Sequence, residues 1–90
     1  MNYRQEALLK IILKPQTARF LIALATRKRT GGELAQMGIR GVSVSALLLA
    51  GIVEKERTEE GETVYSLTEK GLPLASALKT LMEAAEDVLK

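Results

Sequence analysis

Two short segments on either side of Gly61, residues 52–58 and 62–68, predict a β-hairpin, and they constrain the fold of this chain most strongly. Gly61 suits the positive-φ position of the hairpin turn. The register that places Val53 opposite Leu67 gives the hairpin one apolar face. An isolated hairpin is marginal in water, so this face must pack on other elements.

Helical spacing governs the first third of the chain. Residues 3–13 and about 16–27 each place apolar side chains every three or four positions, which predicts two amphipathic helices. Pro15 separates them, because its ring has no amide hydrogen and disfavours helix at the preceding residue. A basic triplet, Arg27-Lys28-Arg29, closes the second segment, where cations suit the negative end of the helix dipole.

The middle of the chain predicts two further helices. The residues from Thr30 to Glu33 have the Thr-Gly-Gly-Glu pattern of a capping box, in which the threonine caps a short helix and the glutamate reaches back to it. Another helix, the third of the core, is expected from about Gly41 to Ala50, and Gly51 ends it. The predicted order is therefore helix, helix, short helix, helix, hairpin, helix, which is a mainly α fold with a β-hairpin.

The last predicted helix, about 72–89, carries an apolar stripe with the 4-3-4-3 spacing of a coiled-coil seam. This is an excess of apolar helix surface for so short a chain, so we expect the first and last helices to form the interface of a homodimer. The alternative is that they pack only on their own domain. The residues expected at the interface are Leu8, Ile11, Ile12, Leu74, Leu78, Leu81, Ala85 and Val88.

The composition argues against several function classes. The chain has no cysteine and no histidine, so zinc sites built from Cys and His are excluded and the commonest general base is missing. No phosphate-binding glycine loop is present. We therefore expect no enzymatic activity, no cofactor and no metal. No apolar run is long enough to span a bilayer and the start is unlike a signal peptide, so we expect a cytoplasmic protein without membrane contact.

Charge is unevenly distributed along the chain. Residues 1–29 carry seven Lys or Arg and one acid, whereas residues 59–90 carry seven acids and three lysines. The basic N-terminal third fits a surface that contacts phosphates, and it fits solvated helix faces equally well.

Three stretches, in this order, resemble winged helix-turn-helix regulators of the multiple-antibiotic-resistance, arsenical-resistance and phenolic-acid-decarboxylase groups. They are Gly32-Glu33-Leu34-Ala35, Leu49-Ala50-Gly51-Ile52-Val53-Glu54-Lys55 and Tyr65-Ser66-Leu67-Thr68-Glu69-Lys70-Gly71. The resemblance covers about residues 30–71. It implies one winged helix-turn-helix domain of residues 1–90, with a core of about 16–71, an added N-terminal helix of about 3–13 and a C-terminal dimerisation helix of about 72–89.

The resemblance also implies a function. In such regulators the third core helix enters the major groove and the hairpin, or wing, contacts the backbone or the minor groove. The implied protein is a dimeric, sequence-preferring transcription regulator that binds double-stranded DNA, and no effector ligand is indicated. By position, the DNA contacts would come from Arg40, Gly41, Ser43 and Ala46 in the groove, from Lys55, Arg57 and Thr58 on the hairpin, and from Arg27, Lys28 and Arg29 on phosphates.

Two features depart from that pattern. The third core helix offers few base-reading groups, and the segment from Glu33 to Gly51 is shorter than in those regulators. The hairpin is acidic, with five glutamates around Lys55 and Arg57, and phosphate repels acidic groups. These features leave open an alternative function, a winged-helix module for protein–protein interaction that does not bind DNA.

Overall fold

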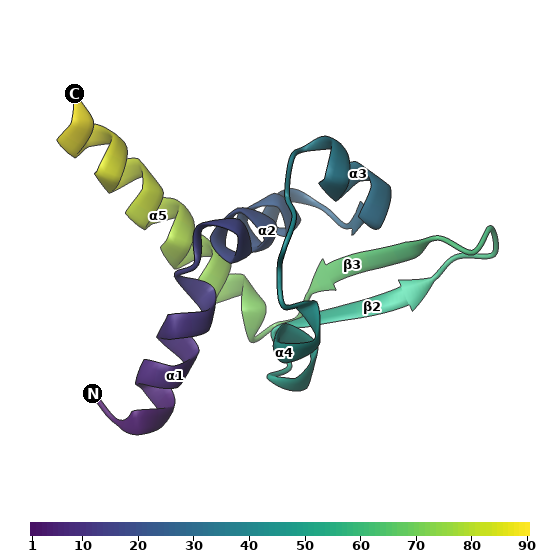
Figure 1. The fold of residues 1–90 in the computed structure, drawn as a ribbon, viewed down its shortest axis with the longest axis horizontal. Helices are drawn as coiled ribbons and strands as arrows, with labels where there is room; N and C mark the ends of the chain where they lie inside the picture. The colour runs from purple at the N-terminus through teal and green to yellow at the C-terminus, as the bar shows by residue number, and fades with distance from the viewer.

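The computed structural model describes all 90 residues as five α-helices and one three-stranded antiparallel sheet (Figure 1). In chain order the elements are α1 (Tyr3–Ile12), α2 (Pro15–Thr26), β1 (Arg29–Thr30), α3 (Gly31–Gln36), α4 (Val44–Leu49), β2 (Val53–Arg57), β3 (Thr63–Leu67) and α5 (Gly71–Leu89). This arrangement confirms the predicted mainly α fold with a β-hairpin.

Local signals begin both N-terminal helices. The Asn2 side chain accepts a hydrogen bond from the Gln5 amide at 2.9 Å, and the Gln5 side chain accepts one from the Asn2 amide at 2.9 Å. This capping box fixes the start of α1. Pro15 is the first residue of α2, where its missing amide hydrogen costs nothing, so it separates the two helices as predicted.

The hairpin of β2 and β3 has the predicted register. Val53 lies opposite Leu67, and Lys55 lies opposite Tyr65. Gly61 has φ of +87° at the turn, a value that glycine adopts without strain. The ring of Phe20 in α2 meets the Tyr65 ring edge-on, with centroids 5.7 Å apart, and so holds the hairpin against the helices.

The sheet contains a strand that the sequence did not predict. β1 is only two residues long and pairs with β3 rather than with its neighbours in sequence, so that the strand order is β1-β3-β2. Arg29 lies opposite Tyr65 and Thr30 lies opposite Val64. The hairpin is therefore anchored along one edge by the chain that leads from α2 into α3.

A single aliphatic core joins the helices to the base of the hairpin. α2 lies at its centre, because Leu21 is fully buried and α2 supplies more core residues than any other element. The twelve buried residues are Ile12, Phe20, Leu21, Ala23, Leu24, Leu34, Ile39, Leu47, Ile52, Val53, Ala75 and Leu78.

A tight junction ties the start of α5 to the base of the hairpin. The Thr68 hydroxyl donates to the Gly51 carbonyl oxygen at 2.5 Å and accepts from the Gly71 amide at 3.2 Å. Gly71 is buried, and a Cβ atom at this position would lie 2.2 Å from the Ile52 carbonyl oxygen. Only glycine allows the two backbone segments to approach this closely.

The third core helix begins later than the sequence predicts. The prediction was a start at about Gly41, but α4 begins at Val44, and residues 37–43 form a connection that we call the α3–α4 loop. Gly41 has φ of +69°, a left-handed value that a right-handed helix does not contain. Gly41 and Ser43 therefore precede the helix instead of forming its first turn, and Arg40 lies further from its start.

Candidate nucleic-acid interface

Arg29 of the basic triplet is part of the fold. Its Nε donates to the Ala23 carbonyl oxygen at 3.0 Å, and its Nη2 donates to the Thr26 hydroxyl at 3.0 Å. The guanidinium thus satisfies one of the carbonyls that the last turn of α2 leaves without an intrahelical partner.

The other two members of the triplet form ion pairs. Arg27 pairs with Glu33 of α3, and Lys28 Nζ lies 3.3 Å from Glu56 Oε1 on β2. All four side chains remain accessible to solvent, so each pair contributes on the order of 0–1 kcal/mol.

The Thr30 amide and the Arg27 guanidinium both donate hydrogen bonds to the Glu33 carboxylate. Its Oε1 accepts from the Thr30 amide at 3.0 Å, and the Thr30 hydroxyl accepts from the Glu33 amide at 3.1 Å, which confirms the predicted capping box. The hydrogen bond from Arg27, followed by that from the Thr30 amide, lowers the pKa of Glu33 from 4.5 to about 2. Both groups favour the charged carboxylate in the folded chain.

This pKa shift predicts an acid-dependent loss of stability. Because the folded-state pKa lies below the unfolded one, the contribution is fully present above pH 4.5 and is lost as the pH falls towards about 2. We expect Glu33→Gln to flatten the fall in melting temperature across this window. Glu59→Gln, in the exposed hairpin turn, is the control and should follow the wild-type profile; identical profiles for all three proteins would contradict the prediction.

The hairpin separates its charges between two faces. Side chains alternate along a strand, so Lys55 and Arg57 lie on the face of Tyr65, whereas Glu54 and Glu56 lie on the opposite face. The face of Tyr65 is the one on which α2 packs. The hairpin that looks uniformly acidic in the sequence therefore presents cations on the side of the helices and carboxylates on the other.

Two of the six candidate cations have no partner within the chain. The side chains of Arg40 and Lys55 are exposed and form neither an ion pair nor a hydrogen bond. Arg57, in contrast, donates to the Gly61 carbonyl oxygen at 3.2 Å. Arg40 lines a shallow hollow of 200 Å³ together with Tyr65, and Lys55 lies opposite Tyr65 in the sheet.

The α3–α4 loop is attached to α2 at two points. Arg19 Nη2 donates to the Met37 carbonyl oxygen at 2.8 Å, and the Arg40 amide donates to Gln16 Oε1 at 3.2 Å. Ile39 is buried between these two points. The loop backbone is therefore fixed while the Arg40 side chain extends into solvent.

The exposed face of α4 was only partly identified from the sequence. Leu47 is fully buried, Ser45 and Leu49 lie on the far side of the helix with Leu49 90% exposed, and Ala46 is half-buried at the side. Ala46 was among the predicted contacts, but Ser45 and Leu49 were not. The helical spacing of these two residues from the buried Leu47 was the signal that could have found them.

The residues predicted at a dimer interface differ in burial: two are buried, three are exposed, and Leu8, Ile11 and Leu74 are half-buried. Ile12 and Leu78 are 4% and 6% exposed and belong to the core of the chain itself, so little of either side chain is left for a partner. A helical stripe does not reveal which part its own domain covers. Leu81 and Val88, in contrast, are 55% and 83% exposed, and Ala85 is exposed too.

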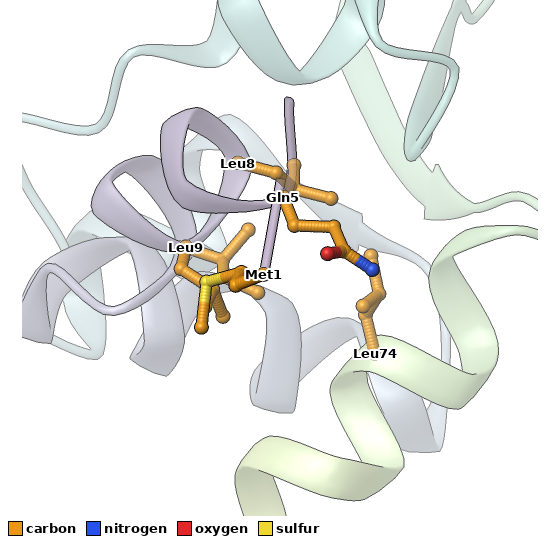
Figure 2. A pocket seen from close by; sticks show the side chains of 6 residues that line it. Met1, Gln5, Leu8, Leu9 and Leu74 are labelled. Carbon is orange, nitrogen blue, oxygen red and sulfur yellow. The ribbon is translucent and has the colours of Figure 1, made fainter. Parts of the chain in front are cut away.

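An apolar groove of about 390 Å³ separates α1 from α5 (Figure 2). Leu8 lines it from α1 and Leu74 lines it from α5, and both are half-buried. The side chain of Gln5 points across the groove towards Leu74.

None of the five helices combines the length and the apolar character that a membrane span requires. No cluster of acidic side chains is placed to hold a metal ion.

The fold has close counterparts among solved structures. The transcriptional repressor BigR from Xylella fastidiosa is 30% identical, with a TM-score of 0.72 over 92% of this chain and 87% of that chain. For ytfH from Salmonella typhimurium the identity is 21%, the TM-score is 0.78, and the match covers 94% of this chain and 83% of the other.

A mutant of ZitR from Lactococcus lactis is 21% identical, with a TM-score of 0.69 over 86% of this chain, which spans only 57% of the ZitR chain. No protein-family model matches the sequence, and no curated protein matches it. The identity to BigR extends over nearly the whole of both chains, and the order of helices and hairpin is the one that the resemblance implied. The chain belongs to the winged helix-turn-helix transcriptional regulators of the MarR/ArsR type.

Proposed function

We propose that this chain is a dimeric, sequence-preferring transcription regulator that binds double-stranded DNA. The observation that carries the proposal is the winged-helix arrangement shared with the repressor BigR at 30% identity. Basic residues capture the backbone, and the α3–α4 loop with the start of α4 enters a groove. The proposed contacts are Arg40, Gly41, Ser43 and Ala46 at the groove, Lys55, Arg57 and Thr58 on the hairpin, and Arg27, Lys28 and Arg29 on phosphates.

The separation of charge on the hairpin supports this docking. DNA that approaches the face of Tyr65 meets Lys55 and Arg57, while the carboxylates of Glu54 and Glu56 point away from it. Lys55 can bind a phosphate without breaking an internal contact. Arg27 and Lys28 must first leave Glu33 and Glu56, so their contribution is smaller.

Salt dependence tests the proposed DNA surface. In fluorescence anisotropy with a labelled duplex, wild-type affinity should fall steeply as salt rises. Each phosphate that a cation neutralises adds about 0.9 to the slope of log K against log salt. Lys55→Ala removes one such cation from each protomer of the dimer, so it should reduce the slope by about 1.8. Lys79→Ala, which removes the same charge from the exposed face of α5, is the control and should leave the slope unchanged.

Two outcomes of this titration would count against the proposal. A wild-type protein that binds no duplex even at low salt is not a DNA-binding regulator, and it would favour the interaction-module function instead. Equal slopes for Lys55→Ala and the wild type would remove the hairpin face from the contact surface.

The dimer part of the proposal rests on the C-terminal half of α5. Every residue beyond Leu78 is exposed, yet Leu81, Ala85 and Val88 continue the apolar spacing. Figure 1 shows this half projecting away from the other helices and from the hairpin. A second copy of the chain would bury the stripe, with further contacts from Leu8, Ile11 and Leu74, and a two-fold dimer matches two half-sites on DNA.

Light scattering tests the dimer. The wild type at micromolar concentration should have twice the mass of the chain, and Leu81→Glu should give folded monomers because a charge would enter the apolar stripe. Ser76→Glu places the same charge on the opposite, exposed face of α5 and should remain dimeric. A monomeric wild type would disprove the dimer.

A further inference from the structure

We infer that Arg40 is the residue through which this chain reads DNA sequence, by donating two hydrogen bonds to one guanine of each half-site. The inference rests on the proposed function, and it adds the residue and the base that set the specificity. Guanine offers two acceptors, O6 and N7, at its major-groove edge, and a guanidinium matches both at once.

Arg40 stands alone among the residues that could enter a groove. Between Met37 and Ala50 it is the only Arg, Lys, Asn or Gln. Outside the core, α4 offers Ser45, Ala46 and Leu49, which contain no group that bonds two acceptors of one base. A serine hydroxyl donates or accepts and so discriminates poorly between base pairs.

The backbone that carries Arg40 is held in place. Its amide donates to Gln16 Oε1 at 3.2 Å, and the preceding residue, Ile39, is buried in the core. Gly41 follows with φ of +69°, and a Cβ atom at this position would meet nothing within 4 Å. The atoms of a bound duplex can therefore approach the loop closely. Because the backbone at Arg40 is already fixed, less conformational entropy is lost when the residue binds a base.

The Arg40 guanidinium is also free, unlike those of its neighbours. The arginines around this surface that are bound to a group of the chain are Arg19, Arg27, Arg29 and Arg57. Arg40 has no such contact, so binding a base requires no internal bond to break. The loop thus presents one unoccupied, bidentate donor.

Selection from a random pool identifies the base that is read. The probe is a pool of DNA duplexes about 20 base pairs long, enough for two half-sites. Wild-type protein should enrich sequences with one invariant guanine in each half-site. Arg40→Ala removes both donors, so it should lose the preference at that position alone. Lys55→Ala, which removes a phosphate contact, should retain the wild-type preference and bind all sequences more weakly.

A single-atom change in the DNA then tests the contact. Replacing the selected guanine by 7-deazaguanine removes the N7 acceptor, and it should weaken wild-type binding within the range of about 5- to 150-fold set by one bidentate pair. Binding by Arg40→Ala should not change on this replacement. The two changes together form a double-mutant cycle that isolates the pair.

The possible results separate the two claims. If the wild type binds no duplex at low salt, the proposed function fails. If it binds duplexes but selects no guanine, or if 7-deazaguanine weakens Arg40→Ala as much as the wild type, the proposed function stands and the assignment of Arg40 is overturned.

Discussion

Replacing Leu47 by alanine should lower the free energy of unfolding by about 2–5 kcal/mol. Leu47 is fully buried in α4, within the aliphatic core. Removal of the Leu47 side chain leaves a cavity that the surrounding core residues cannot fill, because the chain has few large side chains and only three aromatic residues. Since domains of this size are stable by only about 5–15 kcal/mol, the variant should unfold at a much lower urea concentration.

Leu49 provides a matched control in the same helix. It lies two positions further along α4 and is 90% exposed, so Leu49→Ala should change the free energy of unfolding by at most about 0.5 kcal/mol. Urea denaturation followed by circular dichroism measures both variants. If the two variants unfold at the same urea concentration, α4 does not face the core in the way described.

Gly71→Ala should destabilise the chain by at least the 1–3 kcal/mol or so that overpacking costs. The added Cβ atom would lie 2.2 Å from the Ile52 carbonyl oxygen and 3.0 Å from a methyl group of Leu67. The first of these neighbours is backbone, so it cannot rotate away. Either α5 or the base of the hairpin must shift, and the Thr68 hydrogen bonds that join them would lengthen.

Gly31→Ala is the control for this substitution. Gly31 begins α3 without a positive φ, and a Cβ atom there would meet nothing within 4 Å. We expect it to stabilise the chain by about 0.4–1 kcal/mol, because alanine restricts the unfolded state more than glycine does. Thermal denaturation of the two variants should therefore give shifts of opposite sign, and a Gly71→Ala protein as stable as the wild type would refute the close approach.

The parts of the fold that local chemistry specifies were predictable from the sequence. The hairpin register follows from the apolar residues at its base, because a slip of one residue would separate Val53 from Leu67. The capping box at Thr30 is likewise encoded within four residues.

Features that depend on long-range pairing were not predictable. β1 has two residues and no periodicity, and it exists only because β3 offers a free edge. The start of α4 was placed too early because nothing local to Gly41 excludes a helix; its left-handed conformation comes from the path that the loop must follow. The sequence also did not show that Lys55 faces the helices and Glu56 faces away, because that requires knowing which face of the hairpin packs on them.

The candidate DNA surface was predicted by resemblance rather than by physics. The sequence could name Arg27, Arg29 and Arg40 together, but it could not show that two of them are bound within the chain and one is free.

The hydrogen bonds of Thr68 with Gly51 and Gly71 fix the first turn of α5 to the hairpin, so a motion of the far end of α5 also moves the hairpin. The helix has 19 residues and so is about 28 Å long. Its first turns are clamped to the hairpin, whereas its far half is free of the body. In a dimer joined through the far halves, a change in the angle at which the two copies of α5 cross would move both hairpins. The distance between the two hairpins would then change, and so would the spacing of operator half-sites that the dimer can span.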